Sequence, residues 1–166
     1  MSRWRAVWVL GLAAALAGCG FHLRGAAVLP EEMVRTELRG ALPEGPLGIE
    51  LAQVLRNAGG ALVGPGEGGT AVLHIVNERF DRRVASVGAA GKASEYELRY
   101  ALKAVLRTPE GKNMAPQQSA VVVRTYGFDP ANVLGASNEE ELLRGEMRRQ
   151  AVRQLLRQFN QALQPQ

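Results

Sequence analysis

The chain has 166 residues, of which 46% are hydrophobic and 22% are charged, and its formal net charge is +4. Removal of residues 1–18 would leave 148 residues with 18 basic and 16 acidic side chains, the size of one domain with its own core. Near neutrality disfavours nucleic acid as a partner, because nucleic-acid binding usually needs a clustered basic surface.

The N-terminus predicts a secretory signal. Arg3 and Arg5 precede an apolar run, residues 6–17, that is too short to span a bilayer. Residues 1–18 are expected to be cleaved as a lipoprotein signal peptide, because the run ends in a lipobox, Leu-Ala-Gly-Cys, at Cys19.

Cys19 is the only cysteine, and we expect it to carry a covalent lipid rather than to be an ordinary core cysteine. Several acyl chains on one residue anchor a protein durably, since each buried methylene contributes about 0.8 kcal/mol. An aspartate after the cysteine commonly retains lipoproteins at the inner membrane, whereas this chain has Gly20. The expected location is therefore the outer membrane, on its periplasmic face.

Residues 19–30 have no clear period and are predicted to be a lipidated tether, and residues 31–166 are predicted to form a single domain. Alternation over residues 33–38 predicts a first strand. Pro46 suits the first turn of a helix, which the glycines at positions 59 and 60 are expected to end.

Three further strands are predicted after this helix. They cover residues 72–80, 95–107 and 119–126, and residues 81–94 are predicted to be a loop or a frayed hairpin tip. The strand 95–107 has the clearest pattern, with period-2 alternation typical of one buried and one solvated face. Its expected buried residues are Tyr96, Leu98, Tyr100, Leu102, Ala104 and Leu106.

A long C-terminal helix is predicted to begin at a capping box formed by Ser137 and Glu140. Its apolar stripe at 3.6-residue spacing contains Leu142, Leu143, Met147, Ala151, Leu155, Leu156, Phe159 and Leu163. The element order β-α-β-β-β-α predicts an α+β two-layer sandwich. In it, two helices pack on one face of a four-stranded mixed sheet and leave the other face uncovered.

Enzyme and cofactor signatures are sparse, so we expect no catalytic activity and no cofactor beyond the lipid on Cys19. His22 and His74 are the only histidines, and with no second cysteine a thiolate zinc site is excluded. Gly91-Lys92 resembles the end of a phosphate loop but lacks its other required residues. A basic group remains in the predicted loop, either as exposed charges or as an anion site: Arg82, Arg83 and Lys92.

The segment Cys19-Gly20-Phe21-His22-Leu23-Arg24-Gly25 resembles the start of the LPS-assembly lipoprotein family (LptE, also called rare lipoprotein B). Shorter similarities follow in the family's order along nearly the whole chain after Cys19. They are Gly45-Pro46-Leu47, Ala85-Ser86-Val87, Glu95-Tyr96, Phe128-Asp129-Pro130 and Asn138-Glu139.

This resemblance implies an outer-membrane protein that plugs and helps assemble the LptD β-barrel. It also implies a part in placing lipopolysaccharide in the outer leaflet, with lipopolysaccharide itself as a possible ligand. The chain departs from the family at Ala89, Ala90 and Ser137, where members can carry basic residues associated with lipopolysaccharide.

Lipopolysaccharide presents phosphates and acyl chains, so its site needs cations beside apolar residues. The expected site is therefore Arg82, Arg83 and Lys92, close to Val84 and Val87. Two other classes remain open from the sequence: a lipid-anchored adaptor that binds peptidoglycan or another envelope component, and a lipid-anchored hydrolase.

Overall fold

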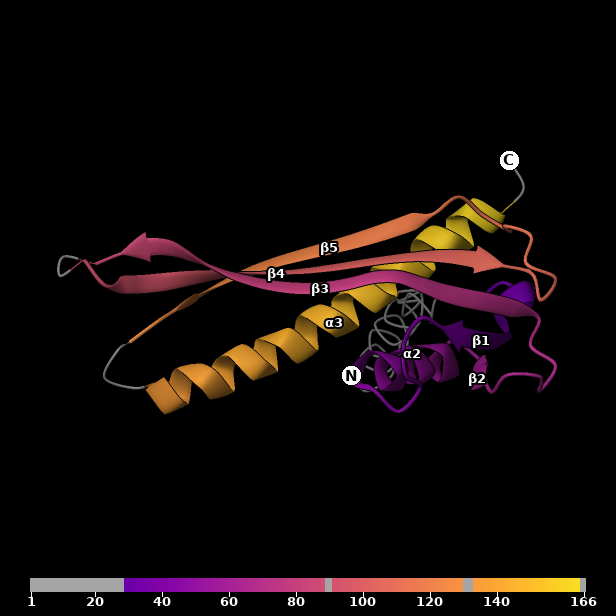
Figure 1. Cartoon of the computed structure of the whole chain (residues 1–166), viewed down its shortest axis with the longest axis horizontal. Coiled ribbons are helices and arrows are strands. Elements are labelled where there is room, and N and C mark those ends of the chain that lie inside the picture. Colours follow the sequence, from indigo (N-terminus) through magenta and orange to yellow (C-terminus); the bar gives the residue numbers. More distant parts are fainter. Residues whose placement is uncertain (1–28, 89–90, 130–132, 165–166) are drawn as a thin grey trace, which may run out of the picture.

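The computed structural model describes residues 29–88, 91–129 and 133–164. Cys19, the signal peptide and most of the predicted tether lie outside this part of the chain. The elements in chain order (Figure 1) are η1 (Glu31–Met33), β1 (Arg35–Arg39), α2 (Pro46–Asn57), β2 (Ala61–Val63), β3 (Ala71–Val87), β4 (Ala93–Arg107), β5 (Gln118–Gly127) and α3 (Val133–Leu163).

The strands form one mixed sheet of five strands in the order β2-β1-β3-β4-β5. β1 pairs in parallel with β2 and β3, and β3, β4 and β5 pair antiparallel. The predicted two-layer sandwich is confirmed, but the predicted number of strands is wrong by one. The missed strand, β2, has only three residues and is too short for alternation to show.

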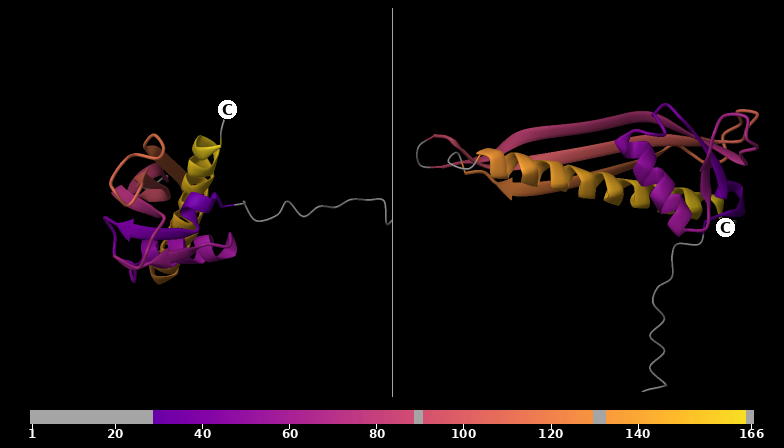
Figure 2. Two further views of the ribbon diagram at one scale, coloured as in Figure 1. Left: turned by 90° about the vertical axis from the view of Figure 1, so that its right-hand side faces the viewer. Right: turned by 90° about the horizontal axis from the view of Figure 1, so that it is seen from below.

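β3 and β4 form a long hairpin that extends well beyond β1 and β2 (Figures 1 and 2). Most of the predicted loop 81–94 belongs to this hairpin: Asp81 pairs with Arg99, and Val84 pairs with Tyr96. Only residues 88–92 connect the strands. Of the two alternatives given for residues 81–94, the hairpin tip is confirmed and the loop is wrong. The sequence could not decide between them because β3 carries polar side chains on both faces here, so polarity does not separate strand from turn.

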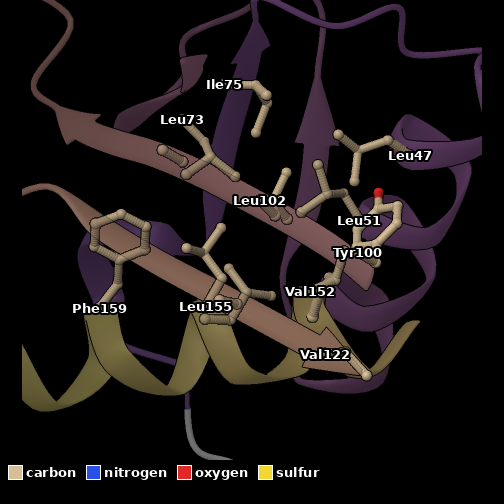
Figure 3. Close-up of a cluster of buried hydrophobic side chains, with 14 of the residues drawn as sticks. Leu47, Leu51, Leu73, Ile75, Tyr100, Leu102, Val122, Val152, Leu155 and Phe159 are labelled. Atoms are coloured by element: carbon tan, nitrogen blue, oxygen red, sulfur yellow. The ribbon is translucent and has the colours of Figure 1, made fainter. Parts of the chain in front are cut away.

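The main core lies between one face of the sheet and the two helices (Figure 3). The face predicted for β4 is confirmed, since Leu98, Tyr100, Leu102, Ala104 and Leu106 are each 0% exposed. The helices cover these residues with Leu47, Leu51 and Leu55 of α2 and with Met147, Ala151, Val152, Leu155, Leu156 and Phe159 of α3.

Helix α2 begins and ends as predicted. Pro46 is at its first turn, and the Gly60 amide donates to the Leu55 carbonyl at 2.9 Å past its end. Gly59 has a φ of +85°, a left-handed conformation that glycine adopts without steric cost.

Helix α3 runs beneath the long strands (Figure 2) and begins at Val133, so the predicted cap at Ser137 is wrong. Glu140 makes contacts with β3 and β5 instead of capping the helix. Leu142, predicted to lie in the apolar stripe, is 71% exposed. The fully buried side chains of α3 lie between Met147 and Phe159, so apolar packing holds the C-terminal half of this helix.

Candidate functional site

The three basic residues predicted to form one site are separated by the fold. Arg82 pairs with Leu98 and Arg83 pairs with Glu97, so these two neighbours lie on opposite faces of the sheet. Lys92 is exposed in the turn between β3 and β4. The structure therefore brings together no cluster of all three side chains.

Arg82 lies on the face that α3 covers. Its Nη1 donates to Glu140 Oε2 at 2.8 Å, and its guanidinium lies 4.7 Å from the centre of the Tyr96 ring. The hydrogen bond to Glu140 raises the pKa of Arg82. Tyr126 Oη donates to the same Glu140 oxygen at 2.8 Å. Arg82 is thus engaged in a contact between β3, β5 and α3.

Aromatic rings complete this contact, which we call the α3 clamp: Arg82, Tyr96, Tyr126, Phe128 and Glu140. The Tyr96 and Tyr126 rings stack at 5.9 Å, and the Phe128 ring meets Tyr96 edge-on at 5.1 Å. Nothing in the sequence pattern of α3 indicated that Glu140 reaches the sheet, because its partners are 14 and 58 residues away in the sequence.

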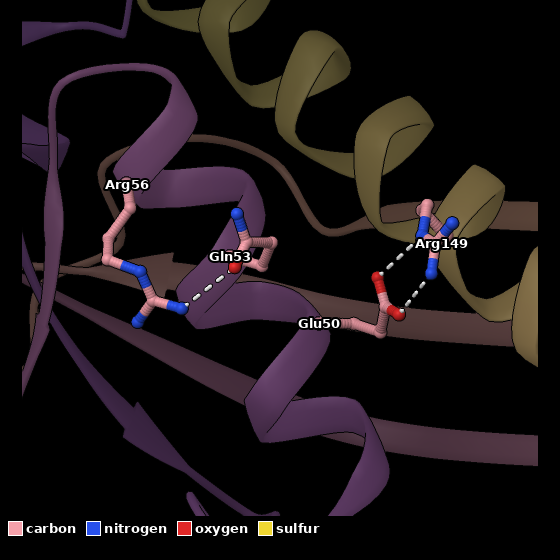
Figure 4. Close-up of polar contacts among 4 residues, drawn as sticks. All are labelled: Glu50, Gln53, Arg56 and Arg149. Carbon is pink, nitrogen blue, oxygen red and sulfur yellow. Dashed lines mark hydrogen bonds and ion pairs between the residues drawn. The ribbon is translucent and has the colours of Figure 1, made fainter.

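A second polar group fixes the middle of α3 to the sheet. Arg148, only 7% exposed, lies with its Nε 3.6 Å from Glu78 Oε1, and Tyr100 Oη donates to the same oxygen. Burial, followed by the bond to Glu78, raises the pKa of Tyr100. Arg149 binds Glu50 of α2 through two bonds of 3.1 Å (Figure 4). These contacts fix both helices relative to the sheet.

Arg83 lies on the opposite, solvated face of β3, β4 and β5, which we call the open face. Two ion pairs lie on it: Arg79 to Asp81 within β3 at 2.7 Å, and Arg83 of β3 to Glu97 of β4 at 2.8 Å. The exposed Arg99 makes no ion pair with another described residue. A hollow on the open face is lined by Arg79, Asp81, Arg83, Glu97, Arg99 and Val123.

Exposed valines accompany these charges. Val121 and Val123 of β5 are 41% and 45% exposed, and their registers with Ala101 and Arg99 place them on the open face. No helix covers this face in the described part of the chain (Figure 2). It therefore presents paired charges, one unpaired arginine and apolar side chains to the surroundings.

The described residues contain no group of three or more His, Cys, Asp or Glu side chains placed to hold a metal ion. Among these residues, no helix is long and apolar enough to cross a membrane. His74, one of the two histidines, lies half-buried in β3.

The LptE family model, described as lipopolysaccharide-assembly, matches residues 35–159. The chain belongs to the LptE family. It is 34% identical over 152 residues to the LPS-assembly lipoprotein LptE of Photorhabdus laumondii, covering 91% of this chain and 82% of that protein. It is 35% identical to the LptE of Yersinia pestis (strain Pestoides F), covering 91% and 73% of the two chains.

Solved structures agree with this LptE assignment. The solution structure of an uncharacterized lipoprotein B from Nitrosomonas europaea is 31% identical with a TM-score of 0.68, covering 87% of this chain and 94% of that one. Rare lipoprotein B from Shewanella oneidensis is 25% identical with a TM-score of 0.65, covering 76% and 94% of the two chains.

Two LptE-like motifs have clear structural roles here. Gly45 precedes α2 and Pro46 opens it. Glu95-Tyr96 lies at the distal end of β4, where Tyr96 joins the α3 clamp. Of the three positions where the resemblance leads us to expect a departure from the family, Ser137 lies within α3, and Ala89 and Ala90 lie outside the described residues.

Proposed function

We propose that this LptE-family chain is an outer-membrane lipoprotein that plugs and helps assemble the LptD β-barrel. In this role it takes part in the transport and insertion of lipopolysaccharide into the outer leaflet. The diacylglyceryl chain on Cys19 would hold residues 31–166 at the periplasmic face of the membrane. We assign it no catalytic reaction.

The observation that supports a plug role best is the open face. A domain inside a large barrel meets a polar, hydrated wall, because the lumen of such barrels is polar. Ion pairs such as Arg83 to Glu97 at 2.8 Å let a sheet face be polar without a large net charge. The exposed side chains of Arg99 and Val123 are available for contacts with the barrel.

Crosslinking from the open face tests this role. A photo-reactive residue at Arg99 or Val123, in the full lipidated chain in cells, should crosslink to one large outer-membrane β-barrel. A matched probe at Arg56, exposed on α2, reports how far the barrel surrounds the domain; among the described residues its side chain bonds only to Gln53. Absence of barrel crosslinks from Arg99, Val123 and Arg56 alike would contradict the plug role.

Direct binding of lipopolysaccharide is the second part of the proposal, and Arg82, Arg83 and Lys92 are its candidate residues. Arg82 and Arg83 are each bonded to a carboxylate, but the Arg83 side chain is 75% exposed and the Arg82 side chain is 49% exposed on the face that α3 covers. Lys92 is exposed in the turn between β3 and β4. Val84 and Val87, 50% and 65% exposed, supply apolar surface at the same end of the hairpin. Of the three basic residues, we therefore expect Arg83 and Lys92 to contribute most to affinity.

The variant Arg83→Ala/Lys92→Ala should weaken lipopolysaccharide binding at least about tenfold at low salt, since each charge-assisted bond typically contributes about 1.5–3 kcal/mol before screening. The control Arg56→Ala/Lys103→Ala removes the same charges from other surfaces and should bind like the unchanged chain. Equal losses in both variants would move the site elsewhere, with the arginines of α3 next in line.

A further inference from the structure

A small cavity opens on the side of the sheet opposite the helices, at the end distant from the hairpin tip. Its volume is about 170 Å³, and its lining contains no carboxylate side chain. We call it the basic cavity. It is lined by Arg39, Val72, His74, Arg107, Thr108, Pro109 and Gly111.

The sheet register brings three basic side chains to this cavity from three adjacent strands. Arg39 of β1 is directly opposite His74 of β3. Arg107 of β4 is opposite Val72, two residues before His74 and therefore on the same face. Residues 39, 74 and 107 are far apart in the sequence, so only the paired strands bring them together.

In each of the two arginines, the guanidinium Nε atom makes a hydrogen bond to a neighbouring side chain. Arg39 Nε bonds to Glu37 Oε1 at 2.7 Å, and Arg107 Nε bonds to Asn113 Oδ1 at 3.3 Å. Neither arginine has a hydrogen bond from its Nη atoms to another described residue. The donors on four Nη atoms, two from each arginine, therefore remain available, and the anchored arginine side chains lose little freedom on binding an anion.

His74 is held by tight backbone packing. A Cβ atom at Gly40 would lie 2.2 Å from the Ile75 carbonyl oxygen and 2.9 Å from His74 Cδ2. Gly40 also has a φ of +79°. Only glycine lets the chain after β1 pass so close to His74, and this packing restricts the imidazole at the cavity wall.

Two carboxylates lie near the basic cavity without lining it. Glu37 is 7% exposed and is bonded to Arg39. Glu110 lies on the exposed turn after β4. A hydrogen bond with the Thr108 side chain is the main cause that lowers the pKa of Glu110. The negative charge of Glu110 should therefore weaken, but not prevent, the binding of an anion.

We propose that the basic cavity binds a phosphate group, either as the free ion or as the phosphomonoester of a lipid headgroup. Guanidinium groups form strong, charge-assisted bonds to phosphate oxygens, and their planar arrangement of donors matches two oxygens at once. Basic groups from three adjacent strands suit a tetrahedral anion with several oxygens better than a planar carboxylate. This site is independent of the proposed plug role and of the candidate residues in the β3–β4 hairpin.

The test uses the full chain, purified in detergent and titrated by calorimetry in a phosphate-free buffer. Inorganic phosphate and glycerol 3-phosphate are titrated separately, with the His74 ring followed by NMR. Arg39→Gln and Arg107→Gln should each weaken binding about tenfold, the loss of roughly one charge-assisted bond. Glu110→Gln should tighten binding.

Tighter binding of glycerol 3-phosphate would identify the headgroup as the ligand, and tighter binding of inorganic phosphate would identify the free ion.

Arg56→Gln is the matched control, because it removes one exposed arginine from α2, which lies on the opposite face of the sheet. Arg107→Lys keeps the charge and should retain more affinity than Arg107→Gln, which separates lost binding from lost folding. Circular dichroism checks the fold of each variant. No binding of either compound by the unchanged chain, or equal losses in Arg56→Gln and the cavity variants, would overturn the proposal.

Discussion

Arg82 Nη1 and Glu140 Oε2, 58 residues apart in the sequence, lie 2.8 Å apart and join β3 to the first half of α3. Tyr126 donates to the same oxygen. Apolar packing fixes the second half of α3, and this ion pair with its aromatic neighbours attaches the first half to the sheet. A residue that was expected to bind a ligand therefore stabilises the fold.

Glu140→Gln should reduce the free energy of unfolding by about 1 kcal/mol, because it removes the charge that Arg82 and Tyr126 share at a partly exposed position. Urea unfolding measures the change. Glu139→Gln, an exposed neighbour on the same helix, is the control. Equal stability of the two variants would mean that the α3 clamp does not stabilise the protein.

Two helical glycines should respond to alanine in opposite directions. A Cβ atom at Gly48 of α2 would lie 2.3 Å from the Pro43 carbonyl oxygen and 2.4 Å from that of Leu42, whereas one at Gly145 of α3 would meet no atom within 4 Å. Gly48→Ala should cost about 1–3 kcal/mol through this overlap. Gly145→Ala should gain up to about 1 kcal/mol from helix propensity.

Thermal or urea unfolding of both variants gives the answer. Stabilisation by Gly48→Ala would show that the loop before α2 is not packed against the helix as described. Destabilisation by Gly145→Ala would show that another part of the protein occupies the space beside α3.

Much of the fold was predictable because one pattern, the alternation in residues 95–107, reflects burial on one face only. The hairpin tip was not predictable in the same way: Arg82 and Arg83 point to different faces, and both faces are polar there. β2 is too short for a period, and its pairing with β1 depends on tertiary packing. The sequence predicted Glu140 to cap the helix because of its spacing from Ser137. Spacing along the chain cannot show a contact with Arg82, which is 58 residues away.

Stability should fall at high pH because of Tyr100. Its pKa is raised in the folded protein, so between the ordinary tyrosine value near 10 and the folded value the native state holds the proton more tightly than the unfolded chain. The contribution of Tyr100 is thus complete below pH about 10 and declines above it, at up to about 1.4 kcal/mol per pH unit.

Tyr100→Phe isolates this contribution. The variant should be less stable than the unchanged chain at neutral pH, because Glu78 loses its hydroxyl donor. The difference in unfolding free energy should then shrink as the pH rises above about 10. A difference that stays constant across this range would rule out Tyr100 as a source of the alkaline decline.

Lipidation at Cys19 predicts that radiolabelled palmitate enters the protein in Gram-negative cells. Cys19→Ser should abolish labelling and leave an uncleaved precursor, because the thiol is the acceptor and acylation precedes cleavage. Gel mobility and autoradiography of membrane fractions measure both effects. A serine variant that is still processed and membrane-bound would contradict the lipobox interpretation.

Depletion of the protein tests the plug role most directly, with the assembly state of the LptD barrel followed by non-reducing gel electrophoresis of outer membranes. We expect misassembled barrel and entry of large hydrophobic antibiotics, both restored by the unchanged chain but not by Cys19→Ser. A correctly assembled barrel with normal permeability after complete depletion would contradict the account.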